Sequence, residues 1–159
     1  YYKVEIFKAY APYYFDYKEK LLCIVSAMNL VKLLTVESQS NVNVFNLISN
    51  LYLIFNIDEW VKEYIFWELK LLEIVGFNLE LNKIAKYEVI NNEKKYFVGS
   101  NSEKKYIPNF LIDRDGEKLD KKNLSKGLKL VGDFLEKNVL KPNNISYPNS
   151  RLEFVNLFK

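Results

Sequence analysis

Glu68 is the residue of this sequence whose chemical surroundings are most unusual. At about 100° per residue, the segment 57–77 forms a helix with a polar stripe and an apolar stripe. The polar stripe contains Glu59, Lys62, Glu63, Lys70 and Glu73. The apolar stripe contains Val61, Tyr64, Ile65, Leu71, Leu72 and Val75. Glu68 falls among the apolar residues, where an unpaired carboxylate costs several kcal/mol, so it needs a partner or a proton.

An ion pair between helices is the favoured explanation for Glu68. The sequence contains two arginines, Arg114 and Arg151. Arg151 is the better candidate because Arg114 lies in a charged loop, whereas Arg151 belongs to a predicted helix. A catalytic carboxylate and a glutamate that reaches solvent at a helix end are the alternatives.

The residue types needed for most enzymatic chemistry are missing. The sequence has no histidine and a single cysteine, Cys23, which excludes a Ser-His-Asp triad, a Cys-His pair and tetrahedral zinc. The five glycines are scattered and form no phosphate-binding loop. Asp113 and Asp115 are better explained as a solvated charged loop than as a metal site. We therefore expect a protein that is not an enzyme and has no cofactor or metal.

Cellular location follows from the same inventory. Cys23 lies in an apolar run and has no second cysteine to pair with, which favours a reducing, cytoplasmic compartment. No apolar run reaches about 18 residues, so we expect no membrane partner.

Lysines form the main candidate binding surface. On a helix predicted over 123–139, Lys126 and Lys129 lie opposite the apolar residues, with Lys122 at the edge of their stripe. Further lysines surround a predicted hairpin that also carries Tyr87, Tyr96, Phe97 and Tyr106. Basic charge mixed with rings suits salt-sensitive binding of nucleic acid. A solvated lysine face, with the rings in the hairpin's own core, is the alternative. The candidate DNA-binding residues are Lys94, Lys95, Lys104, Lys105, Lys121, Lys122 and Lys126.

These residues are positioned by a mainly α fold with a small β insert. Alternation predicts a strand over 2–10, ended by Pro12. A helix follows over 17–36, with Asp16 as its N-cap. The apolar side of this helix contains Leu21, Leu22, Val25, Met28 and Leu33.

Four further helices and the β insert are predicted from residue 43 onwards. A helix over 43–55 is capped by Asn41 or Asn43. The helix that carries Glu68 is capped by Asp58 and ends with Gly76 at C′. The insert, at about 84–110, has an Asn-Asn hairpin turn and a short third strand at 104–107. A helix that begins at Asp120 or Asn123 runs to 139, and the last helix covers about 149–158.

Three segments resemble the family of the bacterial DNA repair protein RecO. The first is Trp67-Glu68-Leu69 with Leu71-Leu72 and Gly76-Phe77, the second is GLKLVGDFLEKNVL at 127–140, and the third is SRLEF at 150–154. The resemblance covers about 3–159. It implies that 1–12 is the last strand of an N-terminal oligonucleotide-binding (OB) fold and that 13–159 is a helical domain. The sequence does not begin with Met, so we expect most of that barrel to precede residue 1.

The resemblance also implies a function. RecO proteins mediate recombination by loading recombinase and annealing strands, and their partners are single- and double-stranded DNA, RecR and the acidic, Phe-ending tail of the single-strand-binding protein. Lys129, Lys137 and Arg151 are the candidates for binding that tail, while Trp67, Glu68 and Gly76 belong to the scaffold. Many relatives have a cysteine at the position of Ile84, so we expect a metal-free insert. A helical protein-interaction module that binds no nucleic acid is the alternative.

Overall fold

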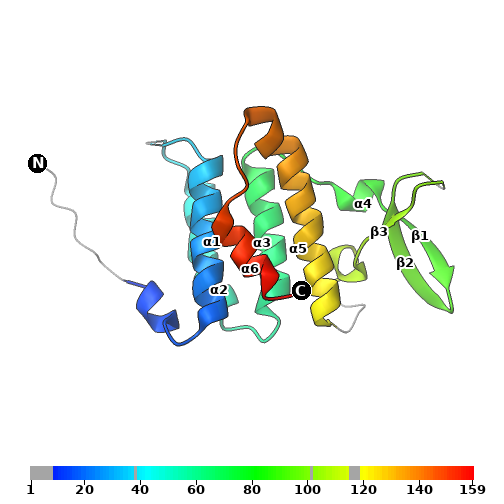
Figure 1. Ribbon diagram of the computed structural model, residues 1–159, viewed down its shortest axis with the longest axis horizontal. Helices are drawn as coiled ribbons and strands as arrows, with labels where there is room; N and C mark the ends of the chain where they lie inside the picture. The colour runs from blue at the N-terminus through cyan, green and yellow to red at the C-terminus, as the bar shows by residue number, and fades with distance from the viewer. Residues whose placement is uncertain (1–8, 38, 101, 115–118) are drawn as a thin grey trace, which may run out of the picture.

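The computed structural model describes residues 9–37, 39–100, 102–114 and 119–159, and its architecture is mainly helical (Figure 1). Three long helices, α1 (Lys18–Leu34), α3 (Trp60–Ile74) and α5 (Lys121–Leu135), lie side by side, and α2 (Val42–Ile54) packs against α3. The short helix α6 (Asn149–Asn156) packs across α1 and α5. The predicted mainly α fold is confirmed.

Residues 1–8 lie outside the described part of the chain, and with them most of the strand predicted over 2–10. Pro12 lies in the first turn of a short 3₁₀ helix, η1 (Ala11–Tyr14), which contacts α1. The assignment of 1–12 to an OB fold therefore stays a prediction.

Helix α1 differs from the prediction in its cap and in its buried face. Its N-cap is Tyr17, which makes no side-chain capping bond, so the assignment of Asp16 was wrong. Val25, predicted to face the core, is 43% exposed. The residues that α1 buries are Cys23, Ile24, Ser26, Ala27 and Leu30. A helix with apolar side chains nearly all round gives too weak a periodic signal to fix its orientation.

Helices α2 and α3 show which caps the sequence identifies well. The Asn41 side chain accepts a hydrogen bond from the Val44 amide at 3.1 Å, as one of the two predicted alternatives requires. Helix α3 begins after Glu59, which makes no side-chain capping bond, so the prediction of Asp58 as its N-cap was wrong. At its other end Gly76 has φ +93°, and the Phe77 amide donates to the Leu72 carbonyl at 2.8 Å. This is a Schellman ending, with glycine at the predicted C′ position.

The insert is a three-stranded antiparallel sheet of order β1-β2-β3. Strands β1 (Lys86–Ile90) and β2 (Glu93–Val98) are joined by Asn91 and Asn92, both with positive φ, as a type I′ turn requires. Strand β3 (Lys105–Tyr106) pairs with β2. A helical turn, α4 (Leu81–Ile84), precedes the sheet and η2 (Asn109–Leu111) follows it. Within the described residues, no three His, Cys, Asp or Glu side chains gather to form a metal site.

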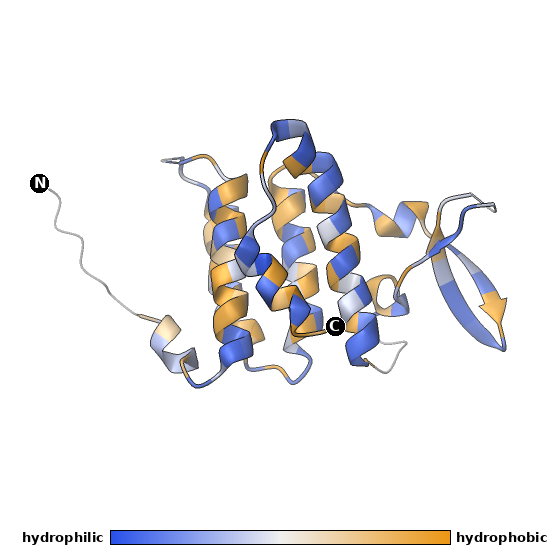
Figure 2. Cartoon of the chain, in the orientation of Figure 1, coloured by the Kyte–Doolittle hydropathy of each residue, from blue (hydrophilic) through white to orange (hydrophobic). Residues whose placement is uncertain are grey.

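Helix α5 is strongly amphipathic and carries the candidate binding residues Lys121, Lys122, Lys126 and Lys129. Asp120 caps it, accepting from the Asn123 amide at 2.7 Å. The helix continues through a π-helical segment, η3 (Glu136–Leu140), and a 3₁₀ turn, η4 (Lys141–Asn143). It buries Gly127, Leu128, Val131, Gly132 and Leu135, and Figure 2 shows hydrophilic and hydrophobic bands alternating along it. No helix in the described residues is long and apolar enough to cross a membrane.

Candidate functional site

A bidentate ion pair joins Glu68 on α3 to Arg151 on α6. Arg151 Nε donates to Glu68 Oε1 at 2.9 Å, and Nη2 donates to Oε2 at 2.6 Å. Both side chains are 2% exposed. The pairing predicted from sequence is therefore present, and its two parallel bonds have the geometry in which arginine binds carboxylate most strongly.

The pair extends into a network that reaches four helices. Tyr64 donates to Glu68 Oε1 at 2.9 Å, and its hydroxyl lies 3.4 Å from Ser26 Oγ on α1. Arg151 Nη2 also donates to the Leu128 carbonyl of α5 at 2.9 Å, and Nη1 donates to the Tyr147 hydroxyl. The network thus connects α1, α3, α5 and α6.

Electrostatics in the network favour a structural role over a catalytic one. Burial alone would lower the pKa of Arg151, but the charge and hydrogen bonds of Glu68 outweigh it, so the pKa is raised. Burial raises the pKa of Tyr64 well above its usual value, and the charge of Glu68 raises it further. Neither group gives up a proton near neutral pH.

Two further contacts show how closely the helices approach. A β-carbon on Gly132 would lie 2.5 Å from the Tyr147 hydroxyl and 2.7 Å from Arg151 Nη1. Glycine at this position therefore gives the guanidinium room beside α5. Trp67 Nε1 donates to the Leu47 carbonyl at 2.7 Å, which joins α3 to α2.

The lysines that the sequence grouped together separate into three environments. Lys95, Lys122 and Lys126 line one groove between the sheet and the start of α5, with a volume of about 280 Å³. We call this the basic groove; its other lining residues are Glu93, Tyr106, Ile107, Pro108, Asn109, Asp120 and Asn123.

The remaining candidate lysines lie elsewhere. Lys104 pairs with Glu88, and its hydrogen bond lowers the pKa of that carboxyl below its usual range. Lys105 pairs with Asp133 of α5 at 2.9 Å. Lys94 lies on the opposite face of β2 from Lys95, and Lys121 is exposed at the first position of α5. Which lysine lies in which environment depends on strand alternation and on contacts between distant parts of the chain.

A second groove lies between α5 and α6, the helices that carry two of the tail-binding candidates, Lys129 and Arg151. We call it the α5–α6 groove; its volume is about 390 Å³. It is lined by Ser125, Lys129, Gly132, Asp133, Glu136, Tyr147, Arg151, Leu152, Val155 and Lys159. Lys137 is not among these described lining residues.

The two carboxylates that line the α5–α6 groove are paired with lysines outside it, which leaves the groove with exposed positive charge. Its two carboxylates, Asp133 and Glu136, pair with Lys105 at 2.9 Å and Lys141 at 3.1 Å. Arg151 is in the wall but its guanidinium binds Glu68. Lys129 and Lys159 are the exposed lysines of the groove.

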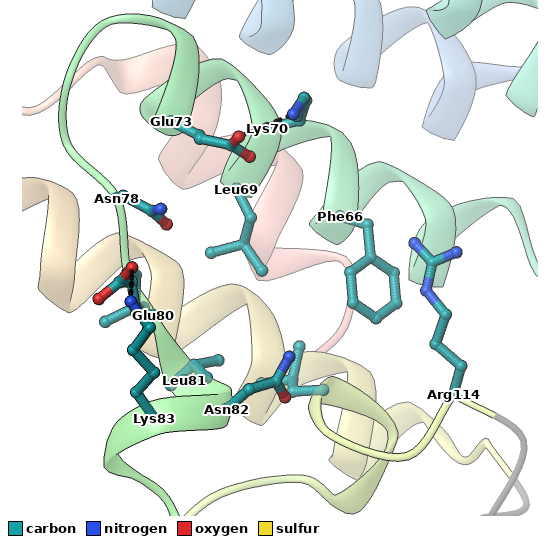
Figure 3. A pocket seen from close by; sticks show the side chains of 12 residues that line it. Phe66, Leu69, Lys70, Glu73, Asn78, Glu80, Leu81, Asn82, Lys83 and Arg114 are labelled. Carbon is teal, nitrogen blue, oxygen red and sulfur yellow. Dashed lines mark hydrogen bonds and ion pairs between the residues drawn. The ribbon is translucent and has the colours of Figure 1, made fainter.

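A third hollow was not predicted from the sequence. It has a volume of about 500 Å³ and lies between α3, α4 and the loop at Arg114. Figure 3 shows Phe66 and Leu69 of α3 lining it and Arg114 beside the Phe66 ring, over which its guanidinium carbon lies at 4.1 Å from the centroid. Lys70 and Lys83 at its rim pair with Glu73 and Glu80. The sequence signal for this hollow is the pair of apolar residues Leu79 and Leu81 that follows the helix end at Gly76, and both residues line it.

Comparison with known proteins identifies the family. The family described as "Recombination protein O C terminal" matches residues 18–146. The DNA repair protein RecO of Rickettsia canadensis (strain McKiel) is 32% identical over 102 residues, which is 63% of this chain and 41% of that protein. RecO of Rhodospirillum centenum is 23% identical over 154 residues, 88% of this chain and 61% of the relative.

Other comparisons agree. RecO of Bartonella henselae is 28% identical over 107 residues, 58% of this chain and 41% of that protein. No solved structure gives a significant match. The chain spans between 41% and 61% of the length of these relatives. Because the family match covers most of the helical fold, the chain belongs to the RecO C-terminal family.

Proposed function

We propose that this chain is the helical part of a non-enzymatic recombination mediator in DNA repair. The observation that supports this most directly is the family match over 18–146, together with relatives that are named DNA repair proteins. In this proposal the protein works in the cytoplasm by binding DNA, RecR and the single-strand-binding protein, so that recombinase is loaded and complementary strands anneal.

We assign phosphate binding to the basic groove. Lys95, Lys122 and Lys126 reach it from two elements, whereas its carboxylates are Glu93 and Asp120. Asp120 is already used to cap α5. A groove in which lysines outnumber carboxylates attracts a polyanion, and each phosphate contact releases counterions. The other candidates, Lys94, Lys104, Lys105 and Lys121, would contribute from outside the groove.

We assign the acidic, Phe-ending tail of the single-strand-binding protein to the α5–α6 groove. Lys129 and Lys159 supply positive charge, while Leu152, which is 45% exposed, and Val155 supply apolar surface for the terminal ring. An aromatic anchor in an apolar hollow with basic residues around it gives both affinity and steering. The residues proposed here differ from the tail-binding candidates of the sequence analysis in two ways. Lys159 takes the place of Lys137, and Arg151 forms part of the groove wall while its guanidinium binds Glu68.

Fluorescence anisotropy with labelled oligonucleotides tests the DNA-binding part. We expect the affinity for single- and double-stranded DNA to fall linearly with salt on a log–log plot. The alternative, a helical protein-interaction module without nucleic-acid binding, predicts no binding even at low salt. A tail peptide measured in parallel would then still bind, which separates the two functions.

A further inference from the structure

Strand alternation divides the side chains of the insert between two chemically different faces. The pairs Tyr87↔Tyr96, Val89↔Lys94 and Val98↔Lys105 put one set on the same side. We call this side the aromatic face; its residues are Tyr87, Val89, Lys94, Tyr96, Val98 and Lys105. The strand carboxylates, Glu88 and Glu93, both lie on the other face. The aromatic face therefore has rings and cations without a carboxylate of the strands. Of its two lysines, Lys105 is paired with Asp133 of α5, so Lys94 is the cation considered below.

The rings of the insert are not equally available. Phe97 is 4% exposed. Tyr106 is 49% exposed, but it lies on the other face, where its hydroxyl donates to Glu88 and its ring packs against Phe97 with 6.2 Å between centroids. Tyr87 is 59% exposed. It is held edge-to-face against Tyr96, with 6.1 Å between ring centroids, and Lys94 Nζ lies 5.2 Å from its ring centroid. Tyr87 is thus an oriented and exposed ring that already accommodates a cation.

The position of Tyr87 makes it accessible to a long ligand. Strand β1 is at the edge of the sheet, and Figure 1 shows the sheet projecting beyond the helices. Among the described strands β1 pairs only with β2, so no described strand covers the outer edge of β1, which carries Tyr87.

We propose that Tyr87 stacks an unpaired base of single-stranded nucleic acid and that Lys94 contacts the adjacent phosphate, while Val89 lies outside this contact. The proposal rests on the nucleic-acid binding proposed above and specifies the form that is bound here. A base in a duplex has its faces covered by its neighbours, whereas an unpaired base offers a face to an aromatic ring. The aromatic face therefore favours single strands, while the lysines of the basic groove bind either form.

The test compares Tyr87→Ala with Val89→Ala in the full chain. Val89 is on the same strand and face and is 61% exposed, but has no ring, so Val89→Ala is a matched control. The probes are a labelled oligothymidine and a labelled duplex of the same length. Loss of one base–aromatic stack lowers single-strand affinity by about 5- to 150-fold. We expect this loss for Tyr87→Ala, no loss for Val89→Ala or Tyr87→Trp, and unchanged duplex affinity.

Salt dependence separates stacking from charge. We expect Tyr87→Ala to leave the salt slope unchanged and Lys94→Gln to reduce it by about 0.7, the value for one phosphate contact on a single strand. Circular dichroism establishes that each variant is folded. The inference alone is overturned if the wild-type chain binds DNA and Tyr87→Ala binds oligothymidine as tightly as Val89→Ala. If the wild-type chain binds no DNA, the proposed function fails as well.

Discussion

Removing the carboxylate of Glu68 leaves Arg151 charged inside the helical domain. In Glu68→Leu the guanidinium retains the Leu128 carbonyl and the Tyr147 hydroxyl but loses both bonds to carboxylate oxygens. Tyr64 loses its carboxylate acceptor at the same time and retains Ser26 Oγ, at 3.4 Å. Because both partners are 2% exposed, water cannot replace these contacts. Breaking such a buried pair from one side costs about 3–5 kcal/mol.

The double variant Glu68→Leu with Arg151→Met separates the pair from its surroundings. It removes both charges, so the free energy of unfolding recovers to within about 2 kcal/mol of wild type. The remainder reflects the bonds lost by the Tyr64 and Tyr147 hydroxyls and the second bond lost by the Leu128 carbonyl. Chemical denaturation with urea, followed by fluorescence of Trp60 and Trp67 and by far-ultraviolet circular dichroism, measures each variant. A shift in the midpoint at constant slope reports stability alone.

The exposed pair Lys70–Glu73 is the matched control. Its atoms are 2.8 Å apart, but the side chains are 54% and 47% exposed. Glu73→Leu should therefore change stability by less than about 1 kcal/mol. The reasoning is refuted if Glu68→Leu is as mild as Glu73→Leu, or if the two changes at Glu68 and Arg151 are simply additive.

Three further predictions concern packing, pH and partner binding. Gly132→Ala places a methyl group 2.5 Å from a tyrosine hydroxyl, so thermal denaturation should show a loss of about 1–3 kcal/mol, whereas a gain would contradict the packing. The hydrogen bond from Lys104 lowers the pKa of Glu88. The stability that ionised Glu88 contributes to the sheet is therefore fully present above the pKa of the unfolded chain, about 4.3, and is lost as pH falls through the pKa of Glu88 in the folded protein. Hydrogen exchange in β1 should rise on acidification in wild type and be less pH-dependent in Glu88→Gln; equal profiles would exclude this role. Lys129→Glu should weaken an acidic, Phe-ending peptide about 10-fold or more by anisotropy, and Lys137→Glu, outside the α5–α6 groove, should not; the reverse order would move the binding site.

Local chemistry made several parts of the fold predictable. Gly76 followed by an aromatic residue predicts a helix end, and Asn91-Asn92 between alternating residues predicts a tight turn, because few other residues adopt positive φ. The ion pair was also predictable, because a carboxylate on an apolar stripe needs a cation and the chain has two arginines. In each case a local requirement restricts the position to a few residue types.

Other features depend on distant parts of the chain. Asp16 and Asp58 have the right type for N-caps, but the helices begin at positions set by packing, after Tyr17 and Glu59. The division of the lysines into groove, paired and opposite-face sets arises from sheet register and from the docking of the insert on α5. Arg114 over Phe66 could not be foreseen from 48 residues of separation, since nothing local relates the two side chains.

The salt dependence of single-strand DNA binding tests the account most directly. The variant is Lys95→Gln with Lys122→Gln and Lys126→Gln, and the control carries Lys18→Gln, Lys32→Gln and Lys83→Gln, which removes the same charge from exposed helical positions. If the basic groove contacts phosphates, the groove variant reduces the log–log slope by about 2, at about 0.7 per contact, while the control retains the wild-type slope. Equal slopes for the two triple variants would contradict the assignment of DNA binding to this groove.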